Sequence, residues 1–240
     1  PKSATVIMVR PQTGEILAMA SYPTYNPNQP ATATSNNGAG KNRAIMDQFE
    51  PGSTFKIVSI SSALSEGTSR LSDIIHCNHG RYSNGRWRLS DDHGYGNLSV
   101  MEVFAKSSNI GTYKIIRKVG QERFFQYIKG FGFGQRTGVQ LPGELAGKVH
   151  HVDDWRDVTM SRVAIGYTIS VTPLQITMAM AAIANGGRLM QPMIIDRIEY
   201  PDGKVMSHYD PHMVHQVMTK ESTRDIIKAM TQVVGNKGTA

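Results

Sequence analysis

Two residues with complementary chemistry, Ser53 and Lys56, lie three positions apart at the start of an apolar run that ends near Gly67. A Pro-Gly pair directly before them breaks any preceding element, so we expect a buried helix to begin near Ser53. Positions i and i+3 share a helix face. Free N–H groups at a helix start favour a developing oxyanion, and a lysine kept neutral by burial can deprotonate a serine hydroxyl. The pair therefore predicts a covalent catalyst.

The spacing alone leaves an ordinary alternative open, in which Ser53 caps the helix and Lys56 points to solvent. The context favours catalysis. Phe55, Ile57 and Val58 surround the lysine in sequence, and a lysine inside an apolar helix costs free energy unless it has a partner or a task.

A second candidate element is Ser107-Ser108-Asn109, between two predicted helices. A serine–lysine catalyst must pass the nucleophile's proton to the leaving amine, and a second hydroxyl near the lysine, here Ser107, relays it. An amide such as Asn109 can hold both the lysine and the substrate's peptide bond. The pattern S-x-N is weak, since the loop sequence Ser35-Asn36-Asn37 also matches it, and an ordinary turn is the alternative for 107–109.

The elements that must position these residues are predicted from periodicity and turn chemistry. A capping box, Ser99 with Glu102, opens a short helix through Phe104 that leads the chain to Ser107. The other expected elements are hairpins at 5–20 and 194–207, a loop at 22–41, strand-like pieces at 76–97, helical stretches at 112–120, 121–129, 173–184 and 221–234, and a glycine-rich connection at 131–147.

The composition narrows the functional class. The chain has 240 residues, 40% of them hydrophobic and 19% charged, as in soluble globular proteins. Its net charge of +7 is spread without a basic run or an aromatic stacking motif, so we expect no nucleic-acid partner. Cys77 is the single cysteine, and its spacing from His76 and His79 does not suit a zinc site. The uncharged run 163–187 contains Pro173 and polar residues, which predicts a buried loop and helix instead of a membrane span.

The motif set S-x-x-K, S-x-N and K-T-G belongs to penicillin-binding proteins and class A β-lactamases. From end to end, this chain resembles the transpeptidase domain of a class B penicillin-binding protein. The resemblance is carried by residues 13–27 in the opening hairpin, 49–56 around the serine, 92–99 before S-x-N, 132–144 in the central connection, and 171–175 with 184–187.

The resemblance implies an α+β fold, with an antiparallel β-sheet flanked by helices, a mainly helical lobe and a cleft between them. It implies that Ser53 is the acylated nucleophile, Lys56 its base, Ser107 the proton relay and Asn109 the residue that holds Lys56 and the substrate amide. The implied substrates are peptidoglycan stem peptides ending in D-Ala-D-Ala, and the implied inhibitors are β-lactams that trap the serine. No cofactor or metal is implied.

The same resemblance implies a place outside the cytoplasm, on the periplasmic face of the cytoplasmic membrane. It also implies an N-terminal membrane anchor and partners among the membrane-anchored proteins of the divisome or elongasome. The sequence opens with Pro1 and shows no signal peptide, so we expect a piece of a longer protein.

The third motif of the set departs from the family, because neither K-T-G nor K-S-G is present. We interpret Lys237-Gly238-Thr239-Ala240 as the loop before the K-T-G strand; the alternative is that it is a remnant of K-T-G itself. Residues 1–240 are then one transpeptidase domain without its C-terminal strands. We expect such a piece to acylate poorly or not at all, since losing one oxyanion donor costs about 10²–10³ in rate.

Two other functions share these motifs. A serine β-lactamase or β-lactam sensor also uses S-x-x-K, but a lactamase needs a base for deacylation, which the sequence does not supply. A non-catalytic envelope scaffold with the same fold is the second alternative. A long-lived penicillin adduct indicates a transpeptidase, whereas fast turnover of the adduct indicates a lactamase. A scaffold would keep its function in Ser53→Ala, and a transpeptidase would lose it.

Overall fold

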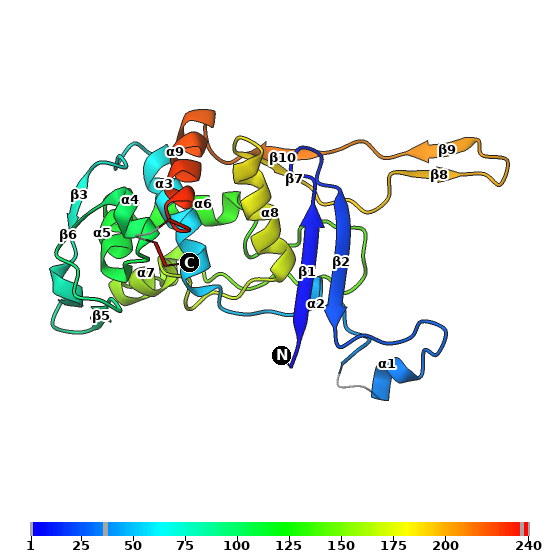
Figure 1. The fold of residues 1–240 in the computed structure, drawn as a ribbon, viewed down its shortest axis with the longest axis horizontal. Helices are drawn as coiled ribbons and strands as arrows, with labels where there is room; N and C mark the ends of the chain where they lie inside the picture. The colour runs from blue at the N-terminus through cyan, green and yellow to red at the C-terminus, as the bar shows by residue number, and fades with distance from the viewer. Residues whose placement is uncertain (1, 36–37, 236–237, 240) are drawn as a thin grey trace.

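Helix α3 (Lys56–Ser65) lies inside a helical lobe in the computed structural model, which describes residues 2–35, 38–235 and 238–239 (Figure 1). It packs against α5, α6 and α9, and every residue from Lys56 to Leu64 is buried. This burial explains why its apolar residues occupy all faces of the helix. The α-helices are α1 (Thr32–Ser35), α2 (Arg43–Met46), α3, α4 (Val100–Ala105), α5 (Asn109–Val119), α6 (Gln121–Gly130), α7 (Asp157–Val163), α8 (Pro173–Ala184) and α9 (Lys220–Thr231), and the 3₁₀ helices are η1 (Gly52–Phe55), η2 (Asn78–Gly80) and η3 (Val152–Asp154).

The β-structure is antiparallel and, within the described residues, is divided into five two-stranded pairs. A parallel bridge between Glu15 and Met193 ties the N-terminal pair to the segment after β7. The pairs are β1 (Ala4–Val9) with β2 (Ile16–Tyr22), β3 (Ile74–His76) with β6 (Asn97–Ser99), β4 (Arg81–Ser83) with β5 (Arg88–Ser90), β7 (Arg188–Met190) with β10 (Met213–Gln216), and β8 (Arg197–Glu199) with β9 (Val205–His208).

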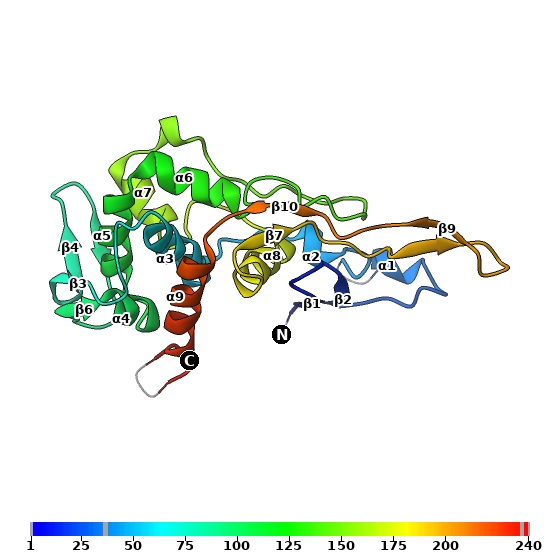
Figure 2. The same cartoon turned by 90° about the horizontal axis from the view of Figure 1, so that it is seen from above.

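The molecule is elongated, with its helical lobe at one end (Figures 1 and 2). Helix α8 lies between this lobe and the β1–β2 hairpin and packs against β1, β7, α2 and α9. The β8–β9 hairpin projects at the other end as a two-stranded arm. Mixed helices and antiparallel pairs make an α+β fold, which confirms the predicted class.

Most predicted elements are present, and the capping chemistry explains their starts. The capping box of Ser99 and Glu102 opens α4. Thr172 and Gln175 form a second capping box at α8, with Pro173 in its first turn. The run 163–187 contains the end of α7, a loop and α8, as predicted. None of the described helices has the length and apolar character needed to cross a bilayer.

The structure differs from the predicted elements in several places. The segment 22–41, predicted as a loop, contains the single turn α1. The last helix starts at Lys220 and ends at Thr231, three residues before the predicted Val234. Helix α7 was not predicted, because Thr159 and Val163 are β-branched and no capping residue of the usual type precedes Asp157.

Candidate active site

Ser53 lies in η1, the 3₁₀ turn that leads directly into α3. Gly52 has a φ of 55°, which glycine adopts without steric cost. Its N–H donates to the Gly166 carbonyl at 3.0 Å, so a distant loop holds the backbone beside the serine. The Ser53 side chain is exposed to solvent, whereas Phe55 behind it is buried. The predicted helix start is therefore confirmed, and it presents the hydroxyl outward.

Lys56 is buried with 1% of its surface exposed, which rules out the solvent-facing alternative. Its Nζ donates to three oxygens: the Ser107 carbonyl at 2.5 Å, the Ser107 Oγ at 2.9 Å and the Asn109 Oδ1 at 2.7 Å. These three acceptors match the three N–H groups of an ammonium. Within the described residues, Ser53 is not among the hydrogen-bond partners of Nζ. Proton transfer from Ser53 therefore needs a neutral amine that gives up one of these contacts.

Burial makes the neutral amine of Lys56 more accessible than that of an exposed lysine. Burial lowers the pKa of Lys56 from its usual 10.5 to about 8, while the nearby charges of Asp91 and Asp92 act in the opposite direction and raise it. With a pKa of about 8, about a tenth of the lysine is neutral at pH 7. Lys56 can therefore act as a general base near neutral pH.

Ser107 reaches Lys56 because of the way α4 ends. The Ser107 N–H donates to the Phe104 carbonyl at 3.0 Å, and the Ser108 N–H donates to the Val103 carbonyl at 2.9 Å. This pair of bonds is the Schellman motif, whose central residue is usually glycine. Ser107 occupies that position with a φ of 55°, a strained value for a residue with a side chain. The turn directs both its carbonyl and its hydroxyl at Lys56.

Asn109 is the first residue of α5, where the helix start is fully capped. The Asp91 carboxylate accepts hydrogen bonds from the Asn109 N–H at 2.6 Å and the Ile110 N–H at 3.0 Å, while the Ser108 Oγ accepts from the Gly111 N–H. Its own side chain bridges two elements: Oδ1 accepts from Lys56, and Nδ2 donates to the Ser90 carbonyl at 2.9 Å. One lone pair and one N–H of the amide remain for a ligand.

A cavity of about 380 Å³ brings the proposed nucleophile, base and relay together, since Ser53, Lys56 and Ser107 all line it. The rest of its lining is mostly apolar and includes Met180 of α8 and Met230 of α9. A hydroxyl, a buried amine and a second hydroxyl at one apolar cavity can carry out acyl transfer.

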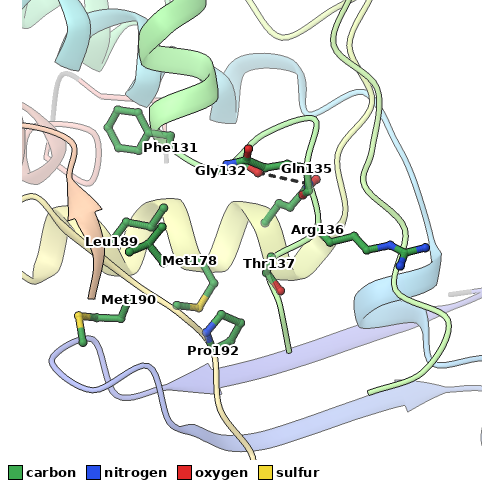
Figure 3. Close-up of a pocket in the computed structure, with 11 residues that line it drawn as sticks. Phe131, Gly132, Gln135, Arg136, Thr137, Met178, Leu189, Met190 and Pro192 are labelled. Carbon is green, nitrogen blue, oxygen red and sulfur yellow. Dashed lines mark hydrogen bonds between the residues drawn. The ribbon is translucent and has the colours of Figure 1, made fainter. Parts of the chain in front are cut away.

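A second, smaller cavity of about 40 Å³ lies between α8, β7 and the connection after α6 (Figure 3). Met178, Leu189 and Pro192 surround it, and none of Ser53, Lys56, Ser107 or Asn109 takes part in its lining. It is too small to admit a peptide, so it is not the candidate active site.

The histidines near Cys77 form no metal site in the described part of the chain, where no group of three or more His, Cys, Asp or Glu residues is arranged to hold an ion. Cys77 is buried, and its Sγ accepts from the Ser108 Oγ at 3.5 Å. The thiol therefore belongs to the packing behind the S-x-N turn.

The sequence did not identify two residues that shape this site. For Asp91 the available signal is a carboxylate that precedes a predicted helix, which is typical of capping. Gly166 gave no signal, because its role depends on contact with Gly52. Lys237 of the Lys237-Gly238-Thr239 segment lies outside the described residues, whereas Thr239 lines the Ser53 cavity.

Comparisons with known proteins place the chain in a family. Residues 4–240 match the penicillin binding protein transpeptidase domain. The chain is 36% identical over 234 residues to penicillin-binding protein PbpB of Mycobacterium tuberculosis, covering 96% of this chain and 34% of PbpB. It is 32% identical over 237 residues to stage V sporulation protein D of Bacillus subtilis, covering 98% of this chain and 36% of that protein. The structure of penicillin-binding protein 3 of M. tuberculosis with aztreonam superposes with a TM-score of 0.90 at 33% identity, over 99% of this chain and 54% of that one.

The chain belongs to the transpeptidase domain family of class B penicillin-binding proteins, as its motifs implied. It spans about a third of the length of these curated relatives.

Proposed function

We propose that this chain is a serine acyltransferase that cross-links peptidoglycan stem peptides, a D-Ala-D-Ala transpeptidase that β-lactams inhibit covalently. The observation that carries the proposal is the buried Lys56 amine, held by Ser107 and Asn109 at the cavity that Ser53 lines. Relatives named peptidoglycan D,D-transpeptidase, such as PenA of Neisseria meningitidis, and a homologous structure that contains aztreonam support it.

The first half of the reaction forms an ester. The Ser53 Oγ attacks the carbonyl carbon between the two D-alanines while its proton passes to the neutral Lys56 Nζ. The C–N bond breaks, and the proton reaches the leaving amine through the Ser107 hydroxyl. Asn109 keeps Lys56 in place, and its remaining hydrogen-bonding capacity orients the substrate amide.

The second half forms the cross-link. An amine of a neighbouring stem peptide attacks the ester carbonyl and gives its proton to Lys56 or Ser107. The C–O bond to Ser53 breaks, its hydroxyl takes up a proton, and a new peptide bond joins the strands. The apolar residues that line the cavity limit the access of water, which would otherwise hydrolyse the ester.

Mass spectrometry after prolonged incubation with penicillin at millimolar concentration tests the proposal. We expect one penicilloyl group on Ser53 and none in Ser53→Ala. Ser72→Ala, which changes an exposed serine away from the cavity, is the matched control and should label normally. An adduct on another residue, or an adduct that persists in Ser53→Ala, would contradict the proposal. Stoichiometric labelling within minutes would contradict the expected need for a K-T-G strand.

We also propose that the protein works outside the cytoplasm, attached to the cytoplasmic membrane and associated with divisome or elongasome proteins. The substrate class supports this location, because cross-linking takes place where peptidoglycan strands are accessible. Protease treatment of spheroplasts tests the location: we expect degradation of the native protein while a cytoplasmic marker survives. Equal protection of both would contradict it.

A further inference from the structure

The β4–β5 hairpin carries two arginines on the face turned away from the core. In its antiparallel register Arg81 lies opposite Ser90, and Ser83 lies opposite Arg88. These four residues are exposed and share the outer face, because side chains alternate along a strand. Leu89 faces inward, in a cluster with Ile110, Tyr113 and Ile165 against which Tyr82 and Trp87 also pack. This packing fixes the arginines on the face of the hairpin that is turned to solvent.

The outer face is hollowed. Arg81, Ser83, Arg88 and Ser90 line an open cavity of about 530 Å³, with Tyr82 and Leu89 contributing to its lining. Among the described residues, neither arginine forms a salt bridge, whereas Arg10, Arg43, Arg123 and Arg197 do. A guanidinium without an acidic partner keeps its planar set of donors available for bidentate bonds to a carboxylate.

This cavity adjoins the candidate active site. Ser90, which lines it, accepts a hydrogen bond from the Asn109 Nδ2 through its carbonyl, and Asn109 in turn accepts from Lys56. The next residue, Asp91, caps the helix that carries Asn109. Two hydrogen bonds therefore connect the lining of the arginine cavity to the amine proposed as the base. A peptide on the hairpin would lie beside Asn109, outside the cavity that Ser53 lines.

We propose that the outer face of the β4–β5 hairpin binds carboxylate groups of the acceptor peptide, the strand whose amine attacks the ester at Ser53. The acceptor role rests on the proposed function, which requires two peptides at one centre. The mostly apolar cavity at Ser53 suits the uncharged part of the donor peptide, which acylates Ser53. The hairpin offers two positive charges and two hydroxyls, which complement a peptide bearing free carboxylates.

Calorimetric titration of the unmodified chain with tri-D-glutamate, and with the same peptide fully amidated, tests the binding. We expect the acidic peptide to bind and Arg81→Gln/Arg88→Gln to weaken it at least about tenfold, since two charge-assisted contacts are lost. Arg70→Gln/Arg86→Gln removes the same net charge from exposed arginines that do not line the cavity. This control should change the affinity less than about twofold.

Penicillin labelling of Ser53, measured on the same variants, separates the two proposals. We expect equal labelling rates in both double variants, because the hairpin would contact only the acceptor. Equal affinity in both double variants, or binding of the amidated peptide as tight as that of the acid, overturns the hairpin inference and leaves the proposed function standing. An adduct that persists in Ser53→Ala overturns the proposed function and the acceptor role with it.

Discussion

In the proposed mechanism, the protonation state of Lys56 decides whether Ser53 can be activated. The ammonium form satisfies all three oxygens around it, and the neutral form leaves a lone pair for the serine proton. Burial favours the neutral form, and the charges of Asp91 and Asp92 favour the ammonium. The pKa of about 8 results from these two opposing effects, so a single substitution that removes one of them should change it.

We predict that acylation of Ser53 rises with pH, about tenfold per unit below pH 8, and levels off above it, because the neutral amine is the reactive form. The free energy of unfolding should also rise with pH. The pKa is lower in the folded than in the unfolded chain, so the cost of burying the charge is full below about pH 8 and is relieved between about pH 8 and 10.5. Asp92→Asn should move the rate profile to lower pH, while the distant Asp202→Asn should leave it unchanged. A flat profile from pH 6 to 9 would contradict the role of Lys56 as base.

At the scale of elements, the site is made where helices begin and end. Helix α4 ends in a Schellman motif at Ser107, α5 begins under the caps of Ser108 and Asp91, and η1 leads into α3 beside Ser53. Helix ends are where backbone N–H and C=O groups lack partners within the helix. They are therefore suited to positioning groups toward a charged side chain or a reacting oxygen.

The strained φ of Ser107 allows the backbone and the hydroxyl to be tested separately. We predict that Ser107→Gly is more stable than Ser107→Ala by about 1 kcal/mol, because glycine adopts a φ of 55° without a Cβ clash. Both variants lose the relay hydroxyl, so penicillin should acylate Ser53 equally slowly in the two. Urea unfolding measures the first difference, and penicillin labelling measures the second. Wild-type labelling by either variant would show that the hydroxyl is not the relay.

At the scale of the whole molecule, segments distant in the chain hold the Ser53 turn. Phe49 pairs with Val171 in an isolated bridge, and the Gly52 N–H donates to Gly166. The approach is close: a Cβ on Gly166 would lie 2.1 Å from the Gly52 carbonyl oxygen. The backbone beside the nucleophile therefore depends on a loop that lies beyond all the catalytic candidates in sequence.

We predict that Gly166→Ala lowers the free energy of unfolding by more than about 2 kcal/mol and slows labelling of Ser53, because the turn must shift to relieve the contact. The control is Gly203→Ala, which has nearly the same φ (82° against 81°) and no atom within 4 Å of the added Cβ. Its cost should reflect backbone strain alone, about 1 kcal/mol, with normal labelling. Equal losses in the two variants would show that the Gly166 contact does not hold the turn.

The sequence by itself determined what is local. The buried helix with its lysine, the capping box at Ser99 and the two hairpins follow from spacings of two to four residues, which helices and strands repeat. The motifs also determined the family. Only the tertiary structure decided that Ser107 offers its carbonyl as well as its hydroxyl to Lys56, that Asp91 caps α5, and that Gly166 packs on Gly52. Those contacts join residues far apart in the chain, and no periodicity or propensity encodes which distant loop will meet a helix end, because packing of the whole chain sets it.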